Sequence, residues 1–340
     1  MRNHGQTHIF LSKISESLEN EPVADVVAIV KSIKGGRWGG TVLHYAAING
    51  HTKLIATILK DMSKEEKFEV LSLGNTNSTN VLQEAAGNSK VETLKFLLES
   101  VDYVMAVQLI EHTTSHGYTT IHRASFTATG IYDVNILEML LNFAPDAKAM
   151  LFKQTSTGFT ALHESLFYQE VAAVRLILSR LPTIQEKERI MTIRAKSGNT
   201  VLHTAARSGN NPEPIDMLLD PLPTTLRKQL LSTVNDKGHT PKALATQYSH
   251  DSVVKVLQYY EDHDVPSNIR TQEGATIHSL YEGLADNHIC YVCLALQWEA
   301  LVCRVGKEKA TETRMSECRN WVCPKRAAQR MISTNTPKFK

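Results

Sequence analysis

The stretch GNTVLHTAARSGN, residues 198–210, places Thr200 three positions before His203, which is followed by Thr204 and two alanines. A hydroxyl near an imidazole can form a nucleophile with its base, or part of a metal site. A catalytic pair has no reason to recur with a fixed period, whereas a structural unit does. The number of copies of this stretch therefore decides between chemistry and architecture.

The pattern returns along most of the chain. Its threonine slot falls at positions 41, 80, 119, 160, 200 and 240, with spacings of 39, 39, 41, 40 and 40 residues. A pair of apolar residues closes a helical pattern after each of the first five slots, and a second pair precedes the next turn. The first pairs are Ile58-Leu59, Leu97-Leu98, Leu140-Leu141, Ile177-Leu178 and Leu218-Leu219. The second pairs are Val70-Leu71, Leu109-Ile110, Met150-Leu151, Ile190-Met191 and Leu230-Leu231. Each unit is thus predicted to contain a turn, two helices and a short extra helical segment.

The G-x-T-x-L-H-x-A-A pattern of these units resembles the ankyrin repeat, and the resemblance covers residues 24–260. It implies an all-α, ankyrin-type helical repeat solenoid. Ankyrin units typically have about 33 residues, so the surplus in each unit is assigned to the extra segment after the second helix. The second unit departs from the pattern with Ser78, Asn80 and Gln83 in the glycine, threonine and histidine slots. The third carries an insertion at residues 125–133, and the sixth lacks the histidine.

The threonine of each unit is expected to cap the helix that follows it, because its side chain can accept an otherwise unpaired backbone N–H. The histidine slot resembles the ankyrin histidine that bridges one turn to the next by hydrogen bonds. It is occupied by His44, His122, His163 and His203. Recurrence with the architectural period predicts a structural role for these side chains.

Three segments are expected. Residues 1–23 form a flexible N-terminal segment, residues 24–260 form the array with its capping helices, and residues 261–340 hold a linker, an apolar Cys-containing segment and a basic tail. The capping helices are expected to pack through Val26, Val27 and Val30 at one end and Val253, Val254 and Leu257 at the other.

The C-terminal segment leaves alternatives open. Cys290, Cys293, Cys318 and Cys323 could form a four-thiolate zinc site, with Cys303 or His288 as substitutes. Free thiols are the expected state, because the first pair lacks the turn that helps two cysteines converge. The apolar run around them is expected to form a partner-docking helix, with a membrane-interface helix as the alternative. His112 and His116 lie four residues apart but lack the carboxylate of an H-E-x-x-H motif.

Function is expected to be binding. No hydrolase, metalloprotease or phosphate-loop motif is present in the sequence, so we expect no enzymatic activity, cofactor or small-molecule substrate. Residues 304–340 carry a net charge of +7 and the preceding residues −5, which gives the body no electrostatic preference for nucleic acid. The first residues show no targeting segment, so we expect a cytoplasmic location. We expect the protein to be a monomer that acts as a scaffold for another protein. The alternative is a recruitment module whose C-terminal segment binds zinc or tethers to a membrane.

The resemblance also implies where the partner docks. In ankyrin-like arrays the turn tips and the exposed positions of the first helix line a concave face. Carried over unit by unit, the predicted partner-binding residues are Arg37, Trp38, Tyr45, Asn77, Glu84, His116, Tyr118, Arg123, Phe159, Glu164, Asn199, Thr204, Lys237 and His239. Trp38, Tyr118 and Phe159 are the strongest candidates, because a turn tip offers an aromatic ring little core to fill and because aromatic residues and arginine often dominate interface energy. The alternative is that each ring folds onto its neighbouring turn.

Overall fold

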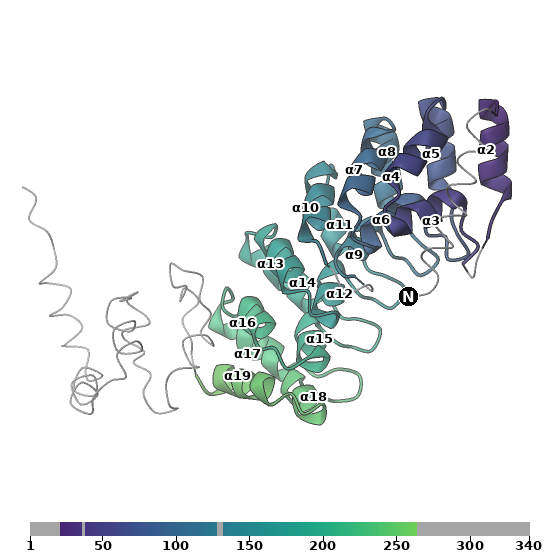
Figure 1. The fold of residues 1–340 in the computed structure, drawn as a ribbon. Helices are drawn as coiled ribbons and strands as arrows, with labels where there is room; N and C mark the ends of the chain where they lie inside the picture. Colours follow the sequence, from purple (N-terminus) through teal and green to yellow (C-terminus); the bar gives the residue numbers. More distant parts are fainter. Residues whose placement is uncertain (1–20, 36–37, 128–131, 264–340) are drawn as a thin grey trace, which may run out of the picture. The chain divides into compact units, whose positions relative to one another are not determined.

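The structure is a computed structural model that describes residues 21–35, 38–127 and 132–263. Its regular elements in those residues are all helices, with one isolated β-bridge between Gly35 and Gly40 (Figure 1). The described residues divide into two compact units. The first comprises residues up to 209 together with 234–240, and the second comprises 210–233 and the residues from 241 onward. The expected all-helical class is confirmed for the described residues.

The helices of the first unit follow the repeat. They are α2 (Val23–Ser32), α3 (Val42–Asn49), α4 (Thr52–Leu59), α5 (Lys64–Ser72), α6 (Val81–Gly87), α7 (Val91–Glu99), α8 (Tyr103–Glu111), α9 (Thr120–Ala124), α10 (Val134–Phe143), α11 (Ala147–Phe152), α12 (Ala161–Phe167), α13 (Val171–Ser179), α14 (Ile184–Thr192) and α15 (Val201–Ser208). Each of the first four repeats thus supplies three helices, and the extra segment predicted from the sequence is the third of them.

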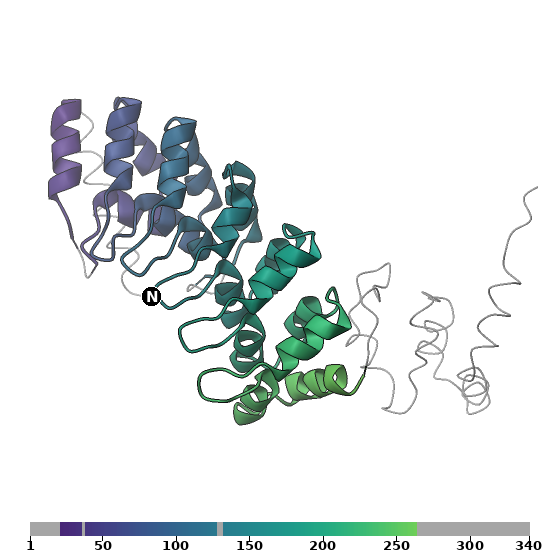
Figure 2. The same cartoon turned by 180° about the vertical axis from the view of Figure 1, so that it is seen from behind.

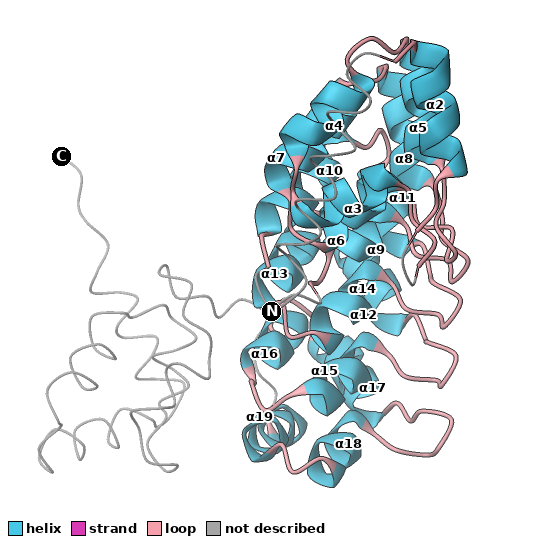
Figure 3. Ribbon diagram, turned by 45° about the vertical axis from the view of Figure 1, so that its right-hand side comes forward, coloured by secondary structure: helices cyan, strands magenta, loops and turns pink. Residues whose placement is uncertain are grey.

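These helices stack in three rows, which Figures 2 and 3 show from two further directions. The first helices of successive repeats contact one another, as do the second helices, and α5 contacts α8 in the third row. The apolar pairs of the repeat lie in this core, because Leu97, Leu109 and Ile177 are all buried. Helix α2 packs against α5 and buries the three valines of the predicted N-terminal cap. The stacking is consistent with a helical repeat solenoid.

A ladder of turns runs along the first unit. Within each turn a backbone N–H bonds to the residue just before the threonine slot, as Thr155 does to Phe159 at 2.8 Å. Between turns a second backbone bond joins neighbours, as in Ser156 to His116 at 2.8 Å and Lys196 to Thr157 at 2.9 Å. Glycines with positive φ make the reversal, among them Gly158 at 83°. Backbone hydrogen bonds therefore hold neighbouring turns together, and side chains of the turns are not required for this contact.

Ser78 stands in the glycine slot of the second turn and has a φ of 57°. A non-glycine residue pays a strain cost in this left-handed region, although glycine loses more backbone entropy on folding. We expect Ser78→Gly to raise the free energy of unfolding by about 0.5–1 kcal/mol. Urea unfolding followed by circular dichroism measures this. An equal or lower unfolding free energy would show that the serine side chain compensates for its backbone.

The threonine and histidine slots cap the first-row helices in the expected way. In the third repeat, Nδ1 of His122 accepts the backbone N–H of Thr119 at 3.2 Å and lies 2.8 Å from its hydroxyl. Nε2 of the same ring lies 3.1 Å from the carbonyl oxygen of Lys153 and 3.3 Å from that of Phe159. A backbone N–H only donates and a carbonyl only accepts, so the ring is neutral with its proton on Nε2. The bridging role predicted for this slot is confirmed here, and His203 reaches the carbonyl of His239 at 3.0 Å in the same way.

The second repeat obtains the same geometry without a histidine. Gln83 accepts the backbone N–H of Asn80 at 3.0 Å through Oε1 and donates to the carbonyl of Tyr118 at 3.0 Å through Nε2. The side chain of Asn80 accepts the N–H of Gln83 at 2.8 Å, which completes the cap. The amide oxygen thus replaces Nδ1 and the amide nitrogen replaces Nε2. The departure seen in the sequence preserves the bonds while removing a titratable group.

The second unit consists of four helices among its described residues. They are α16 (Glu213–Leu219), α17 (Thr224–Ser232), α18 (Pro241–Gln247) and α19 (Asp251–Asp262). Helix α19 contacts the other three and buries Val253 and Leu257, two of the three residues predicted for the C-terminal cap, while Val254 is half-buried. The hydroxyl of Tyr260 donates to the carboxylate of Asp216 at 3.0 Å inside this unit.

Candidate functional site

The residues predicted to bind a partner differ widely in exposure. Trp38, His116 and Lys237 are exposed, with Trp38 at 49%. Half-buried positions are Tyr45, Asn77, Tyr118, Arg123, Phe159 and His239. Buried positions are Glu84, Glu164, Asn199 and Thr204. Arg37 lies outside the described residues. The first-row helices of the second to fourth repeats bring several of these side chains together.

The side chain of Arg123 on α9 occupies the space beside Gly87 of the second repeat, where a larger residue would project. A Cβ atom added to Gly87 on α6 would lie 2.7 Å from the guanidinium carbon of Arg123, so only glycine fits there without a shift. The guanidinium forms an ion pair with Glu84 at 3.6 Å. Burial raises the pKa of Glu84, while Arg123 and a hydrogen bond from Asn75 lower it. The arginine is thus fixed between neighbouring repeats.

Glu164 on α12 lies on the other side of Arg123 and is only 2% exposed. Burial raises its pKa to about 7, opposed by a hydrogen bond from the Tyr118 hydroxyl and by the charge of Arg123. The same burial raises the pKa of Tyr118. These groups hold one another in place and form a polar layer beneath an aromatic surface.

That surface, called the aromatic cluster below, consists of Tyr118, Phe126, Phe159, Phe167 and Tyr168. The rings of Phe126 and Tyr168 stack with centroids 4.2 Å apart, and Tyr118 meets Phe126 edge-on at 6.4 Å. Phe167 contacts Tyr168 at 5.2 Å and Phe159 at 6.2 Å. Phe167 and Tyr168 are each 42% exposed. Five connected rings therefore cross from the third repeat to the fourth, and two of them present large apolar area to solvent.

Three members of the aromatic cluster were not among the predicted residues. Phe126 and Phe167 occupy the slot seven positions after the cap, where other repeats have Ile48, Gly87 and Arg207. This departure from the repeat could have identified Phe126 and Phe167 from the sequence, because residues in the same slot of neighbouring repeats are stacked next to each other. The predicted residues came from the turn tips and the exposed positions of the first helix, and did not include the residues at the end of that helix.

The candidate metal ligands fall into two groups. His112 bonds to the carbonyl of Ser78 at 2.7 Å, and His116 lies 3.1 Å from the hydroxyl of Ser115, so the two rings make separate contacts. The zinc candidates Cys290, Cys293, Cys318 and Cys323 lie outside the described residues, as do Cys303 and His288. Within the described ranges, no group of three or more potential metal-ligating side chains occurs.

The helices of the described ranges include none that is long and apolar enough to cross a membrane.

Comparison with known proteins gives one distant similarity. No family model matches the chain. The chain is similar to the nuclear factor NF-kappa-B p105 subunit of Gallus gallus, with 25% identity over 174 residues. The match covers 51% of this chain and 16% of that protein, so the chain spans only a small part of the length of its relative. The similarity and the repeated helices are together compatible with a protein-binding scaffold.

Proposed function

We propose that this chain is a non-enzymatic, ankyrin-type repeat protein that binds another protein through the aromatic cluster at the ends of its first-row helices α9 and α12. The observation that carries the proposal is the exposure of Phe167 and Tyr168 at 42% each on a rigid stack of rings. Aromatic side chains lose little conformational freedom on binding and supply much contact area, which makes them frequent interface hot spots.

The burial of the individual rings and the charge beside them favour a binding role for the aromatic cluster over a purely structural one. A ring that only filled the core would be buried, as Phe126 is at 5% exposure, whereas its stacking partner Tyr168 is 42% exposed. Arg123 lies with its guanidinium carbon 5.8 Å from the Phe126 ring, so a cation borders the apolar surface. An apolar centre with a charged border is the usual composition of a protein interface.

A photo-crosslinking residue placed at Tyr168 in the full chain is expected to capture a specific protein from cell extract. The same residue placed at Tyr103 is the matched control, because Tyr103 is also exposed, at 55%, but lies on α8 outside the aromatic cluster. With the captured protein purified, Phe167→Ala and Tyr168→Ala should each weaken binding by about tenfold or more, whereas Tyr103→Ala should not.

Thermal melting of each variant separates binding from folding. A Tyr168→Ala protein that melts normally and binds the captured protein with unchanged affinity would contradict the proposal. Equal losses with Tyr103→Ala would also contradict it, because the binding energy would then not be located in the aromatic cluster.

A further inference from the structure

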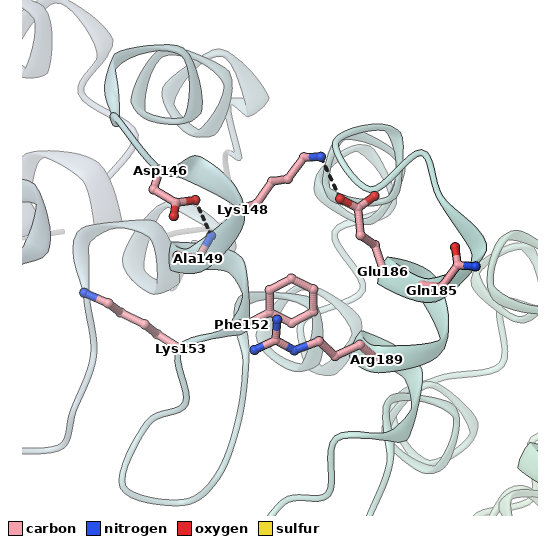
Figure 4. A pocket seen from close by; sticks show the side chains of 8 residues that line it. All are labelled: Asp146, Lys148, Ala149, Phe152, Lys153, Gln185, Glu186 and Arg189. Atoms are coloured by element: carbon pink, nitrogen blue, oxygen red, sulfur yellow. Dashed lines mark hydrogen bonds and ion pairs between the residues drawn. The ribbon is translucent and has the colours of Figure 1, made fainter.

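A groove lies between two third-row helices, α11 and α14, which do not contribute to the aromatic cluster at the ends of α9 and α12. Its volume is about 540 Å³, and its lining residues are Asp146, Lys148, Ala149, Phe152, Lys153, Gln185, Glu186 and Arg189 (Figure 4). All of them belong to the first compact unit. Figure 4 shows the ring of Phe152 in the groove with the side chain of Arg189 lying against it.

The groove arises from the shortness of α11. This helix has six residues, whereas α5, α8 and α14 have nine each. Counted from the apolar pair, α11 lacks a first turn, because Pro145 and the capping residue Asp146 stand where its neighbours are already helical. The facing first turn of α14 is left uncovered, and Ile184 at its start is 38% exposed.

The carboxylates of the groove are already engaged. Asp146 caps α11 by accepting the N–H of Ala149 at 2.8 Å. Glu186 accepts the N–H of Thr183 at 3.0 Å and the ammonium of Lys148 at 2.6 Å. The bond from Lys148, together with those from Thr183, lowers the pKa of Glu186 to about 2. Lys148 is therefore neutralised by a partner across the groove.

Arg189 is left with an uncompensated charge. Its guanidinium carbon lies 4.1 Å from the centroid of the Phe152 ring, which orients the guanidinium plane over the ring. Among the described residues no carboxylate pairs with it, and the side chain is exposed. Lys153, which follows α11, likewise has no carboxylate partner in the described ranges. A guanidinium held flat and open on its edges is suited to bidentate binding of a carboxylate.

The repeat shows that this arrangement is not architectural. In the other third segments the slot of Phe152 holds Ser72, Glu111, Thr192 and Ser232, and the slot of Arg189 holds Glu69, Gln108, Ala149 and Gln229. An aromatic residue facing an arginine across neighbouring repeats thus occurs once among these five segments. The stacking of the array does not require it, since the other segments do without it.

We propose that the groove between α11 and α14 binds an acidic peptide segment of a partner protein. A glutamate or aspartate of the segment pairs with Arg189, and an adjacent apolar side chain packs against Phe152. Lys153 adds a second positive charge at the margin. This goes beyond the binding proposed for the aromatic cluster, because it places a second contact of different chemistry on another face of the same unit.

The test uses the full chain and a fluorescent peptide in which glutamates flank a phenylalanine, with a glutamine-for-glutamate peptide as its neutral counterpart. Fluorescence anisotropy is expected to show binding of the acidic peptide and much weaker binding of the neutral one. Arg189→Gln should weaken binding of the acidic peptide by about tenfold, and Phe152→Leu should also weaken it. Lys95→Gln removes an exposed cation of α7 that does not line the groove, and should leave binding unchanged.

Three outcomes would overturn the proposal. Unchanged affinity in Arg189→Gln, with folding verified by circular dichroism, would place the peptide elsewhere, for instance on the basic residues after position 303. Equal losses in Arg189→Gln and Lys95→Gln would indicate attraction to overall charge. Displacement of the peptide by inorganic phosphate at a comparable concentration would indicate a site for small anions and not for a peptide. Tyr168→Ala should leave this peptide's affinity intact, which separates the groove from the aromatic cluster.

Discussion

Acidification from pH 7 to pH 4 is expected to remove about 3 kcal/mol of stability for each of the caps made by His122 and His163. Burial lowers the pKa of both rings from 6.5 to about 4, against the opposing effect of backbone hydrogen bonds. The unfolded chain therefore binds more protons than the folded chain between these values. Their stabilisation is fully present above pH 6.5 and is lost as the pH falls through 4.

The cap of the second repeat supplies the test, because Asn80 and Gln83 make the same bonds without titrating. The double variant Thr119→Asn/His122→Gln transfers that pair to the third repeat. It should lose about 3 kcal/mol less than the wild-type chain between pH 7 and pH 4. Urea unfolding followed by circular dichroism at both pH values measures the difference.

His116→Gln is the matched control for this variant, since it replaces an exposed histidine of the same repeat that takes no part in the cap. An unaltered acid loss in the double variant would contradict the assignment of this loss to the His122 cap.

Glu164 contributes a pH dependence of stability that is opposite in sign to that of the histidines. Its pKa is raised from 4.5 to about 7, so the folded chain binds more protons than the unfolded chain between these values. This contribution favours folding below pH 4.5 and disappears as the pH rises through 7. Removing it with Glu164→Gln should therefore steepen the net acid loss by about 3 kcal/mol, and the same unfolding measurements detect this. A shallower loss would show that Glu164 is not held protonated by the fold.

Gly158→Ala should lower the free energy of unfolding by about 3 kcal/mol. About 1 kcal/mol comes from the left-handed backbone, with its φ of 83°, and the rest from crowding of the next turn. A Cβ at this position would lie 2.9 Å from both the Cα of Ala195 and the backbone nitrogen of Lys196. The turns would have to separate, which weakens the bond from Lys196 to Thr157.

Gly238→Ala provides the control for this crowding. Its φ of 76° is similar, but a Cβ added there meets nothing within 4 Å. We expect it to cost only the backbone strain, about 1 kcal/mol. Urea unfolding of both variants gives the difference directly. Equal losses would mean that contact between turns contributes nothing and that backbone strain accounts for the whole effect.

The features that every repeat needs in order to stack on its neighbours could be predicted from the sequence. Thr119 could be assigned as a cap because every repeat must begin its first helix, so the residue type recurs. The bridge made by His122 was implied by the resemblance to the ankyrin repeat. Val26 and Val30 could be placed on a capping helix because an array must cover its exposed end. The third helix of each repeat was also predictable, from the surplus length and its apolar pair.

The aromatic cluster lay beyond such reasoning because it breaks the period. The slots of Phe167 and Tyr168 each hold an aromatic residue in only one other repeat, Phe126 and Tyr248 respectively, and one sequence offers no measure of their exposure. The burial of Glu164 was likewise not predictable, since it depends on Tyr118 and Arg123 in the preceding repeat. Contacts between neighbouring repeats determine these features, whereas the sequence pattern describes each repeat separately.

The third row of helices has a mechanical consequence. The resistance of a beam to bending rises steeply with its depth, and the contact between α5 and α8 adds a third layer to the first repeats of the first unit. We expect a stack of three rows to flex less than one of two. A stiffer surface loses less motional freedom when it is occupied, so more of the contact energy is retained as affinity. The extra helix of each repeat can therefore strengthen binding at a face that it does not itself form.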